Sequence, residues 1–125
     1  MRSIGEKCAV FGIYGKGLDV SRLTFFGLYA LQHRGQENSG IATTDGTRLY
    51  SHKGVGLVSQ VYTEDAIKNL PGFAAIGHNR YSTTGASLQD NIQPLSAHLL
   101  NGPVAVAHNG NIVNAHTLRD ELKTQ

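Results

Sequence analysis

Apolar residues come in short runs along the chain, and glycine or proline bounds most of these runs. Cys8 to Tyr14 is followed by Gly15-Lys16-Gly17, which predicts a buried strand and then a turn. Phe73 to Asn79 predicts another buried strand. Asn101-Gly102-Pro103 predicts the turn that leads into a strand from Val104 to His108. The pattern therefore favours a sheet built from several short strands.

A hairpin is predicted in the middle of the sequence. Ser39 to Thr44 and Thr47 to His52 flank the dipeptide Asp45-Gly46. This dipeptide between alternating segments favours a tight type I′ turn, because both of its residues tolerate a positive φ.

Three segments are typical of helices. Ser21 precedes a stretch whose apolar residues recur at helical spacing, with Gly35 expected as its C′ residue; these apolar residues are Leu23, Phe26, Ala30 and Leu31. Thr63 predicts the N-cap of a short helix over Glu64 to Leu70. A last helix is predicted to begin near Asn114 and to continue to the C-terminus.

Composition narrows the class of protein. The 125 residues are 40% hydrophobic and 16% charged, which suits a packed core and excludes a disordered, charge-solvated chain. The net charge is +2 and the basic residues form no run, so we expect no nucleic-acid partner. No apolar stretch approaches the ~18–20 residues of a membrane span. Met1 to Lys7 lacks the apolar region of a secretory signal, and the expected location is the cytoplasm.

The predicted elements form an α+β domain in which no sheet is closed or fully covered. Such a sheet leaves exposed edges, so we expect the chain to be the first part of a larger domain. The alternative is a small, complete protein.

Cys8 is the single cysteine, which excludes an internal disulfide and a cysteine-based zinc site. The simplest interpretation is an inert buried thiol. The other interpretation concerns Met1 to Lys7, which has no structural signature. If this leader were removed, the α-amino group of Cys8 could act as a general base beside its own thiol.

Three polar clusters accompany Cys8. Residues 32–40 could be a solvated helix end with favourable charges, or the edge of a polar pocket. Residues 77–85 place Arg80 in a loop, where its side chain suits a carboxylate or lies on the surface. Asn109-Gly110 could be a simple turn or a pair of oxyanion donors. A thiol, an arginine and a donor pair together suit a thiol amidase acting on an amino-acid amide such as glutamine.

Five ordered strings carry a resemblance to a known family: CAVFGIYG, LQHRGQENSGIA, GHNRYSTTG, NIQPL and AHNGNIVNA. They resemble the glutaminase domain of the amidophosphoribosyltransferase family, a group of class II glutamine amidotransferases. The likeness extends from Cys8 to the end of the chain. It implies the four-layer αββα sandwich of N-terminal-nucleophile hydrolases, here incomplete.

The resemblance implies a role for each site residue. Cys8 would be the nucleophile and, through its α-amino group, the base, forming a γ-glutamyl thioester and releasing ammonia. Asn109 and Gly110 would form the oxyanion hole, and Arg80 would bind the α-carboxylate of glutamine. Further residues would border the nucleophile or shape the pocket: Arg34, Gly35, Tyr81 and Thr83. Where the family has Cys-Gly, this chain has Ala9 after Cys8, which loses the freedom of a positive φ.

The resemblance also implies parts that lie beyond these residues. A downstream acidic residue would bind the substrate α-amino group, and a phosphoribosyltransferase domain would use Mg²⁺ and phosphoribosyl pyrophosphate to make 5-phosphoribosylamine, the first step of purine synthesis. Some members carry an iron–sulfur cluster, and a homo-oligomer is expected at full length; no cofactor is expected within this chain. The rival hypotheses are the glutaminase domain of another class II amidotransferase and an inactive glutamine-binding module.

The leader provides the first test. Intact-mass spectrometry of the full-length protein should show a chain lacking Met1 to Lys7, because Cys8 has no free α-amino group until they are removed. A diazo-ketone glutamine analogue should add one label, and the label should be absent from Cys8→Ala. A chain that keeps the leader and takes up no label would favour the inactive module.

Overall fold

The computed structural model describes residues 8–33, 35–81, 89–110 and 112–125. The described residues form a mixed α/β structure with two antiparallel sheets. Its elements are β1 (Ala9–Tyr14), α1 (Val20–Ala30), β2 (Gln36–Thr44), β3 (Leu49–Val55), α2 (Val58–Val61), α3 (Glu64–Lys68), β4 (Ala74–Tyr81), the 3₁₀ turn η1 (Gln89–Asn91), β5 (Leu95–Leu99), β6 (Gly102–Val106) and α4 (Ala115–Lys123).

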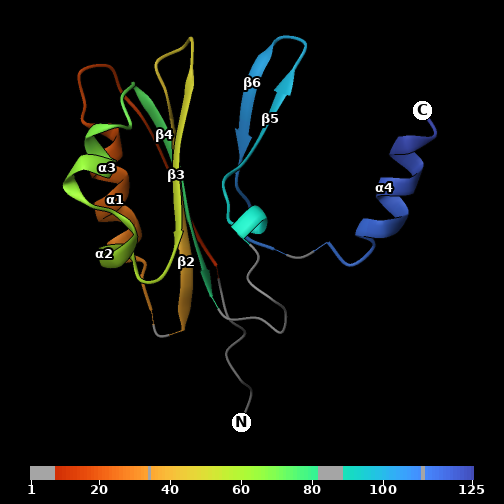
Figure 1. Ribbon diagram of the computed structural model, residues 1–125, viewed down its shortest axis with the longest axis horizontal. Helices are drawn as coiled ribbons and strands as arrows, with labels where there is room; N and C mark the ends of the chain where they lie inside the picture. The colour runs from red at the N-terminus through yellow and green to blue at the C-terminus, as the bar shows by residue number, and fades with distance from the viewer. Residues whose placement is uncertain (1–7, 34, 82–88, 111) are drawn as a thin grey trace.

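The larger sheet has the strand order β1-β4-β2-β3, and the smaller one is the β5–β6 hairpin. Figure 1 shows α1, α2 and α3 on one face of the larger sheet and the hairpin on the other face. The predicted strands, the hairpin and the last helix are confirmed, with boundaries shifted by a few residues. The short helix after its N-cap Thr63 is confirmed as α3. β1 is an edge strand whose residues are half-buried or exposed, so the prediction of a buried first strand was wrong.

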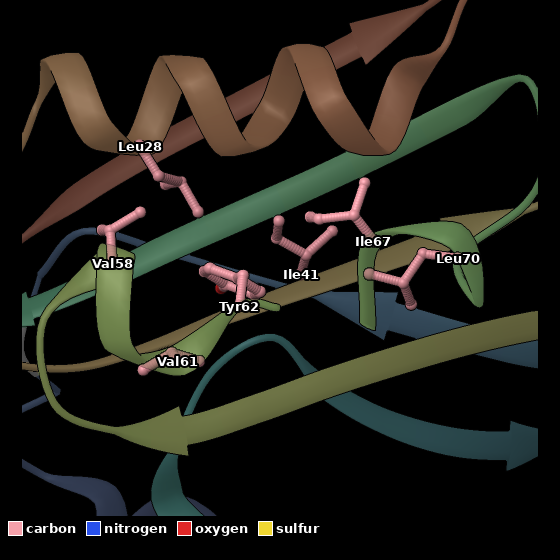
Figure 2. Packing of buried hydrophobic residues seen from close by; sticks show 7 residues of the cluster. All are labelled: Leu28, Ile41, Val58, Val61, Tyr62, Ile67 and Leu70. Carbon is pink, nitrogen blue, oxygen red and sulfur yellow. The ribbon is translucent and has the colours of Figure 1, made fainter. Parts of the chain in front are cut away.

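The hydrophobic core lies between the helices and the larger sheet. Leu28 of α1, Ile41 of β2 and Val58 of α2 are fully buried there. Figure 2 shows these side chains converging with the rest of the cluster, Val61, Tyr62, Ile67 and Leu70. The short α2, which the sequence pattern did not predict, contributes two of these residues.

A buried polar network ties this core to the sheet. The Ser39 hydroxyl donates to Asn79 Oδ1 at 2.8 Å, and the Asn79 amide donates to the Leu28 carbonyl at 2.8 Å. Since the Ser39 proton is used in this way, the Tyr62 hydroxyl, 2.7 Å from Ser39 Oγ, must be the donor of that bond. Burial holds the pKa of Tyr62 well above its usual value, so the phenol remains a donor.

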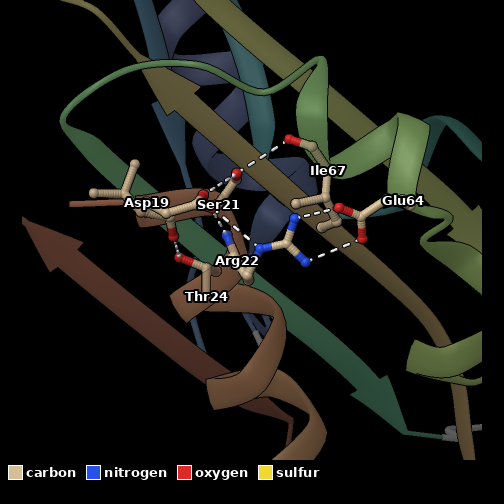
Figure 3. Close-up of polar contacts among 7 residues, drawn as sticks. Asp19, Ser21, Arg22, Thr24, Glu64 and Ile67 are labelled. Atoms are coloured by element: carbon tan, nitrogen blue, oxygen red, sulfur yellow. Dashed lines mark hydrogen bonds and ion pairs between the residues drawn. The ribbon is translucent and has the colours of Figure 1, made fainter. Parts of the chain in front are cut away.

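Polar contacts also join α1 to α3. Asp19 caps α1 by accepting a bond from the Arg22 N–H, and the Arg22 guanidinium pairs with both Asp19 and Glu64. The Ser21 hydroxyl donates to the Ile67 carbonyl at 3.1 Å. Figure 3 shows this arrangement between the two helices. Ser21 therefore lies inside the helix, and the N-cap is Asp19.

The close contact between α1 and β4 depends on a glycine in the strand. The buried residues of α1 are Val20, Ser21, Thr24 and Leu28. A Cβ on Gly77 of β4 would lie 2.7 Å from Thr24 Cγ2, so this helix packs directly onto glycine. The predicted apolar face is wrong, because Leu23, Phe26 and Leu31 are exposed.

Two predicted turns differ from the structure. Gly35 has φ of +88° but follows the C-cap Leu31 by several residues, so it is not the C′ residue of α1. The β2–β3 hairpin is closed by four residues, since Thr44 pairs with Leu49. Asp45 is not in a positive-φ conformation, which excludes a type I′ turn. Its carboxylate instead accepts hydrogen bonds from the Thr47 and Arg48 N–H groups.

The β5–β6 hairpin is seated on the larger sheet at one point and separates from it elsewhere. A Cβ on Gly40 of β2 would lie 2.1 Å from the Gln93 carbonyl oxygen, so the segment before β5 contacts the sheet backbone itself. Toward the other end, an open cleft lies between strands β1, β4 and β2 and the residues Pro103 to Ala105 of β6.

Figure 1 shows α4 beyond the hairpin, on the side away from α1. Its residues are all exposed, so this helix is not part of a packed layer. The α+β class and the two sheets are confirmed, and the four-layer arrangement stays a prediction. Among the described residues, no helix has the length and apolar character needed to cross a membrane.

The Ser39 network predicts an order of stability. Tyr62→Phe removes one donor and should lower the free energy of unfolding by about 1 kcal/mol. Ser39→Ala should cost about 2–3 kcal/mol, because it strands both the Tyr62 hydroxyl and Asn79 Oδ1 in the core. Urea unfolding of the two variants measures the difference. Equal losses would show that Ser39 does not join the two groups.

Candidate functional site

Cys8 and Arg80 come together at one end of the β1–β4 pair. The register pairs Ala9 with Asn79 and Val10 with His78, so its continuation by one residue places Cys8 opposite Arg80. Side chains alternate between the faces of a sheet, and Phe11 packs against Gly27 of α1. Cys8 and Arg80 therefore belong to the opposite face, toward the hairpin. Both are half-buried.

Tyr81 lies on the helix face of β4 and is buried. Its hydroxyl donates to the Leu31 carbonyl and accepts from the His33 N–H, both at 2.7 Å. Burial raises the pKa of Tyr81, and the nearby Cys8 contributes to the rise. Tyr81 therefore holds the residues that follow α1 against the end of β4. Because its side chain is on the other face from Arg80, the structure gives it no place in lining a pocket there.

Gly35 lies close to the Tyr81 end of β4. It precedes Gln36, which pairs with Tyr81 across β2 and β4. Its φ of +88° is a conformation that favours glycine. Two glutamines near Gly35 hold the neighbouring helix. The side chains of Gln32 and Gln36 accept hydrogen bonds from the Val58 N–H at the start of α2.

Asn109 and Gly110 follow the hairpin and are exposed. The residue before them, His108, is bonded to the larger sheet, because its carbonyl oxygen lies 3.2 Å from Nε2 of His78. His78 is two residues from Arg80 on the same face of β4, a distance of about 6–7 Å along a strand. The predicted oxyanion donors thus follow a residue anchored beside the Cys8–Arg80 pair.

The geometry fixes the protonation of His78. A carbonyl oxygen only accepts hydrogen bonds, so Nε2 must carry the proton, and Nδ1 is the unprotonated nitrogen. Nδ1 is buried and has no hydrogen-bond partner among the described residues. Burial lowers the pKa of His78 to about 4, while the bond to His108 opposes the shift. His78 is therefore neutral at pH 7.

The remaining predicted residues fall into two groups. Arg34, Thr83 and the leader Met1 to Lys7 lie outside the described residues. Ala9 lies in β1, where it pairs with Asn79; it is in an extended conformation and does not need the positive φ that glycine allows.

Sequence reasoning missed three residues: Gly40, His78 and Gln93. All three stand inside the strings that carried the resemblance, but their partners are backbone atoms distant in sequence. The described residues contain no group of three or more His, Cys, Asp and Glu side chains arranged to hold a metal ion.

Comparison with curated proteins gives clear matches. The amidophosphoribosyltransferase of Synechocystis sp. is 55% identical over 117 residues, 94% of this chain. That of Bacillus subtilis is 44% identical over 126 residues, 100% of this chain. The chain is a homologue of the amidophosphoribosyltransferases. It spans about a quarter of the length of these relatives, 24% and 26% respectively.

A solved structure agrees with this. The glutamine phosphoribosylpyrophosphate amidotransferase from B. subtilis, complexed with ADP and GMP, matches with a TM-score of 0.79 at 45% identity. The match covers 93% of this chain and 25% of that one. The chain therefore has the fold of the matching quarter of that amidotransferase. No protein-family model matches the chain.

His78 predicts how stability depends on pH. The unfolded imidazole takes up a proton near pH 6.5, but the folded one resists protonation until about pH 4. The free energy of unfolding therefore falls as the pH falls from about 6.5 to about 4. Above this range the contribution of His78 to stability is fully present. Between pH 7.5 and pH 5 the free energy of unfolding should fall by about 2 kcal/mol on account of His78.

The measurement is urea unfolding at several pH values with His78→Gln as the control. His108 and Arg80 also act on this imidazole and are present in both proteins. The variant should lose less stability than the parent over the same range. Parallel curves would contradict the assignment of a neutral, buried His78.

Proposed function

We propose that this chain is the glutamine-hydrolysing part of an amidophosphoribosyltransferase. The observation that carries the proposal is the register of β1 with β4, whose continuation by one residue brings Cys8 opposite Arg80. The segment that leads to residues 109–110 is bonded through His108 to the same stretch of β4. A nucleophile, a carboxylate-binding cation and amide donors on one face suit attack on the side-chain amide of an α-amino acid.

Arg80 orients the substrate. Its guanidinium binds the α-carboxylate of glutamine through two parallel hydrogen bonds, and the side-chain amide then extends toward Cys8. The neutral His78 adds no second positive charge beside Arg80. From the resemblance, Arg34 and Gly35 are assigned to the border of the nucleophile, and Thr83 is assigned to the shape of the pocket.

The reaction divides into two steps. The Cys8 thiol adds to the amide carbon and forms the S–C bond, while its proton passes to the α-amino group exposed by leader removal. The carbonyl oxygen becomes an oxyanion, which accepts hydrogen bonds from the Asn109 side-chain amide and the Gly110 N–H. The proton then moves to the amide nitrogen, the C–N bond breaks and ammonia leaves. Water hydrolyses the γ-glutamyl thioester to glutamate and restores the thiol.

The whole protein would pass this ammonia to a phosphoribosyltransferase domain. There it would displace pyrophosphate from phosphoribosyl pyrophosphate with the help of Mg²⁺, giving 5-phosphoribosylamine. We also propose that the complete domain is the four-layer αββα sandwich, and that the full-length protein is a cytoplasmic homo-oligomer. The names of the homologues support these proposals.

The test is Cys8→Ser in the full-length protein. Glutamine-dependent synthesis of 5-phosphoribosylamine should fall by at least about 100-fold, because serine at this position is a far weaker nucleophile than a thiolate. Synthesis from added ammonium chloride should be unchanged, since it does not need the glutaminase. Coupled assays with each nitrogen source measure the two rates.

Retention of glutamine-dependent synthesis in Cys8→Ser would remove Cys8 from the mechanism. Loss of both activities would point to a folding defect, which Cys8→Ala distinguishes through its melting temperature and ammonia-dependent rate. A parent protein that uses only ammonia would support the inactive glutamine-binding module.

A further inference from the structure

His108 is held at both ends of its backbone, although its side chain is exposed. Its N–H donates to Gln93 Oε1 at 2.7 Å. Its carbonyl oxygen accepts from Nε2 of His78 at 3.2 Å. Both distances suit ordinary hydrogen bonds. The position of this residue is thus set by two side chains from other parts of the chain.

Both partners rest on the same sheet. His78 is fully buried in β4, between Val10 of β1 and Gly40 of β2. Gln93 lies against β2, because a Cβ on Gly40 would come within 2.1 Å of its carbonyl oxygen. The neighbouring Pro94 is buried as well. The bonds to His108 therefore transmit the position of β2 and β4 to the turn that follows.

The bond from His78 has a direct geometric consequence for Asn109. The carbonyl of residue 108 and the N–H of residue 109 belong to one planar peptide unit. A hydrogen bond to that carbonyl therefore restricts the orientation of the whole plane, and with it the start of Asn109. Oxyanion donors are effective when they are held in place before the charge develops.

We propose that His78 and Gln93 are positioning residues that orient the oxyanion hole at Asn109 and Gly110. This inference rests on the proposed function, and it adds residues that do not touch the substrate. His78 acts as a neutral donor and Gln93 as a neutral acceptor. Gly40 supports them, because only a residue without a side chain allows Gln93 to approach the sheet.

Paired variants of the full-length protein separate the hydrogen bond from simple packing. In His78→Gln the amide nitrogen reaches the position of Nε2, whereas in His78→Asn the shorter side chain stops near Nδ1. Gln93→Glu keeps an acceptor oxygen, and Gln93→Met keeps the length without an acceptor. Each pair therefore contains one variant that retains the bond and one that loses it.

Steady-state ammonia release from glutamine is the first measurement. His78→Asn and Gln93→Met should lower kcat by about 10- to 100-fold, approaching the effect of losing one oxyanion donor. The KM for glutamine should stay within about two-fold, because the lost interaction is made in the transition state. His78→Gln and Gln93→Glu should restore most of kcat.

A γ-aldehyde analogue of glutamine gives a second, independent measurement. The Cys8 thiol adds across its C=O bond, forming an S–C bond while the thiol proton passes to the oxygen. The carbon becomes tetrahedral, and its oxygen takes the position of the oxyanion of the reaction. A transition-state analogue should lose affinity by the same factor as kcat. His78→Asn and Gln93→Met should therefore bind the aldehyde about 10- to 100-fold more weakly, while glutamate binding is unchanged.

His52 provides a matched control. Its Nε2 lies 2.7 Å from the Val61 carbonyl oxygen, a bond of the same kind between β3 and the end of α2. His52→Asn should lower the melting temperature without changing kcat or aldehyde affinity. An equal fall in kcat for His52→Asn, or a failure of His78→Gln to restore it, would overturn the positioning role.

Hydrogen exchange keeps this inference separate from the proposed function. The His108 amide should exchange faster in Gln93→Met than in the parent and in Gln93→Glu, whether or not glutamine is hydrolysed. If the parent releases no ammonia, the proposed function fails while this measurement still tests the bond. Equal exchange rates in all three proteins would overturn the proposal.

Discussion

Residues 77–81 of β4 point alternately to the two faces of the larger sheet, and the two faces have different tasks. On one face β4 packs against α1. Gly77 allows the close contact, and Asn79 and Tyr81 donate hydrogen bonds to carbonyls at the end of the helix. On the other, His78 binds the turn after the hairpin and Arg80 lies opposite Cys8. Because a shift of one residue would exchange the faces, the register of β4 with β1 and β2 fixes both the core and the site.

The strands were predictable because short apolar runs between glycines indicate them locally. The buried face of α1 was not, because a count of apolar residues favours Leu23 and Phe26. The helix instead meets β4 at Gly77, where the absence of a side chain leaves room for Thr24 and Leu28. Thr24 is tolerated there because its hydroxyl donates to the Val20 carbonyl within the same helix. Such contacts depend on which strand lies under the helix, and the local sequence pattern does not predict that.

Some residues of the candidate site could also be predicted from the local sequence, and others could not. Cys8, Arg80 and the Asn109-Gly110 pair have side chains or backbone groups whose chemistry can be interpreted directly. His78 and Gln93 stand in equally distinctive strings, but each binds the backbone of a residue far away in sequence. Their contribution follows only from the folded arrangement. Tyr81 is the intermediate case, since its position was predicted and its side chain lies on the opposite face.

The neutrality of His78 has a consequence for how the contact between β4 and residue 108 responds to pH. An ordinary histidine gains its charge near pH 6.5, whereas burial keeps the His78 imidazole uncharged down to about pH 4. His78 therefore donates to the His108 carbonyl without acting as a switch in the range where histidines usually titrate. The contact that holds the segment after the hairpin on the sheet is the same at pH 6 as at pH 8.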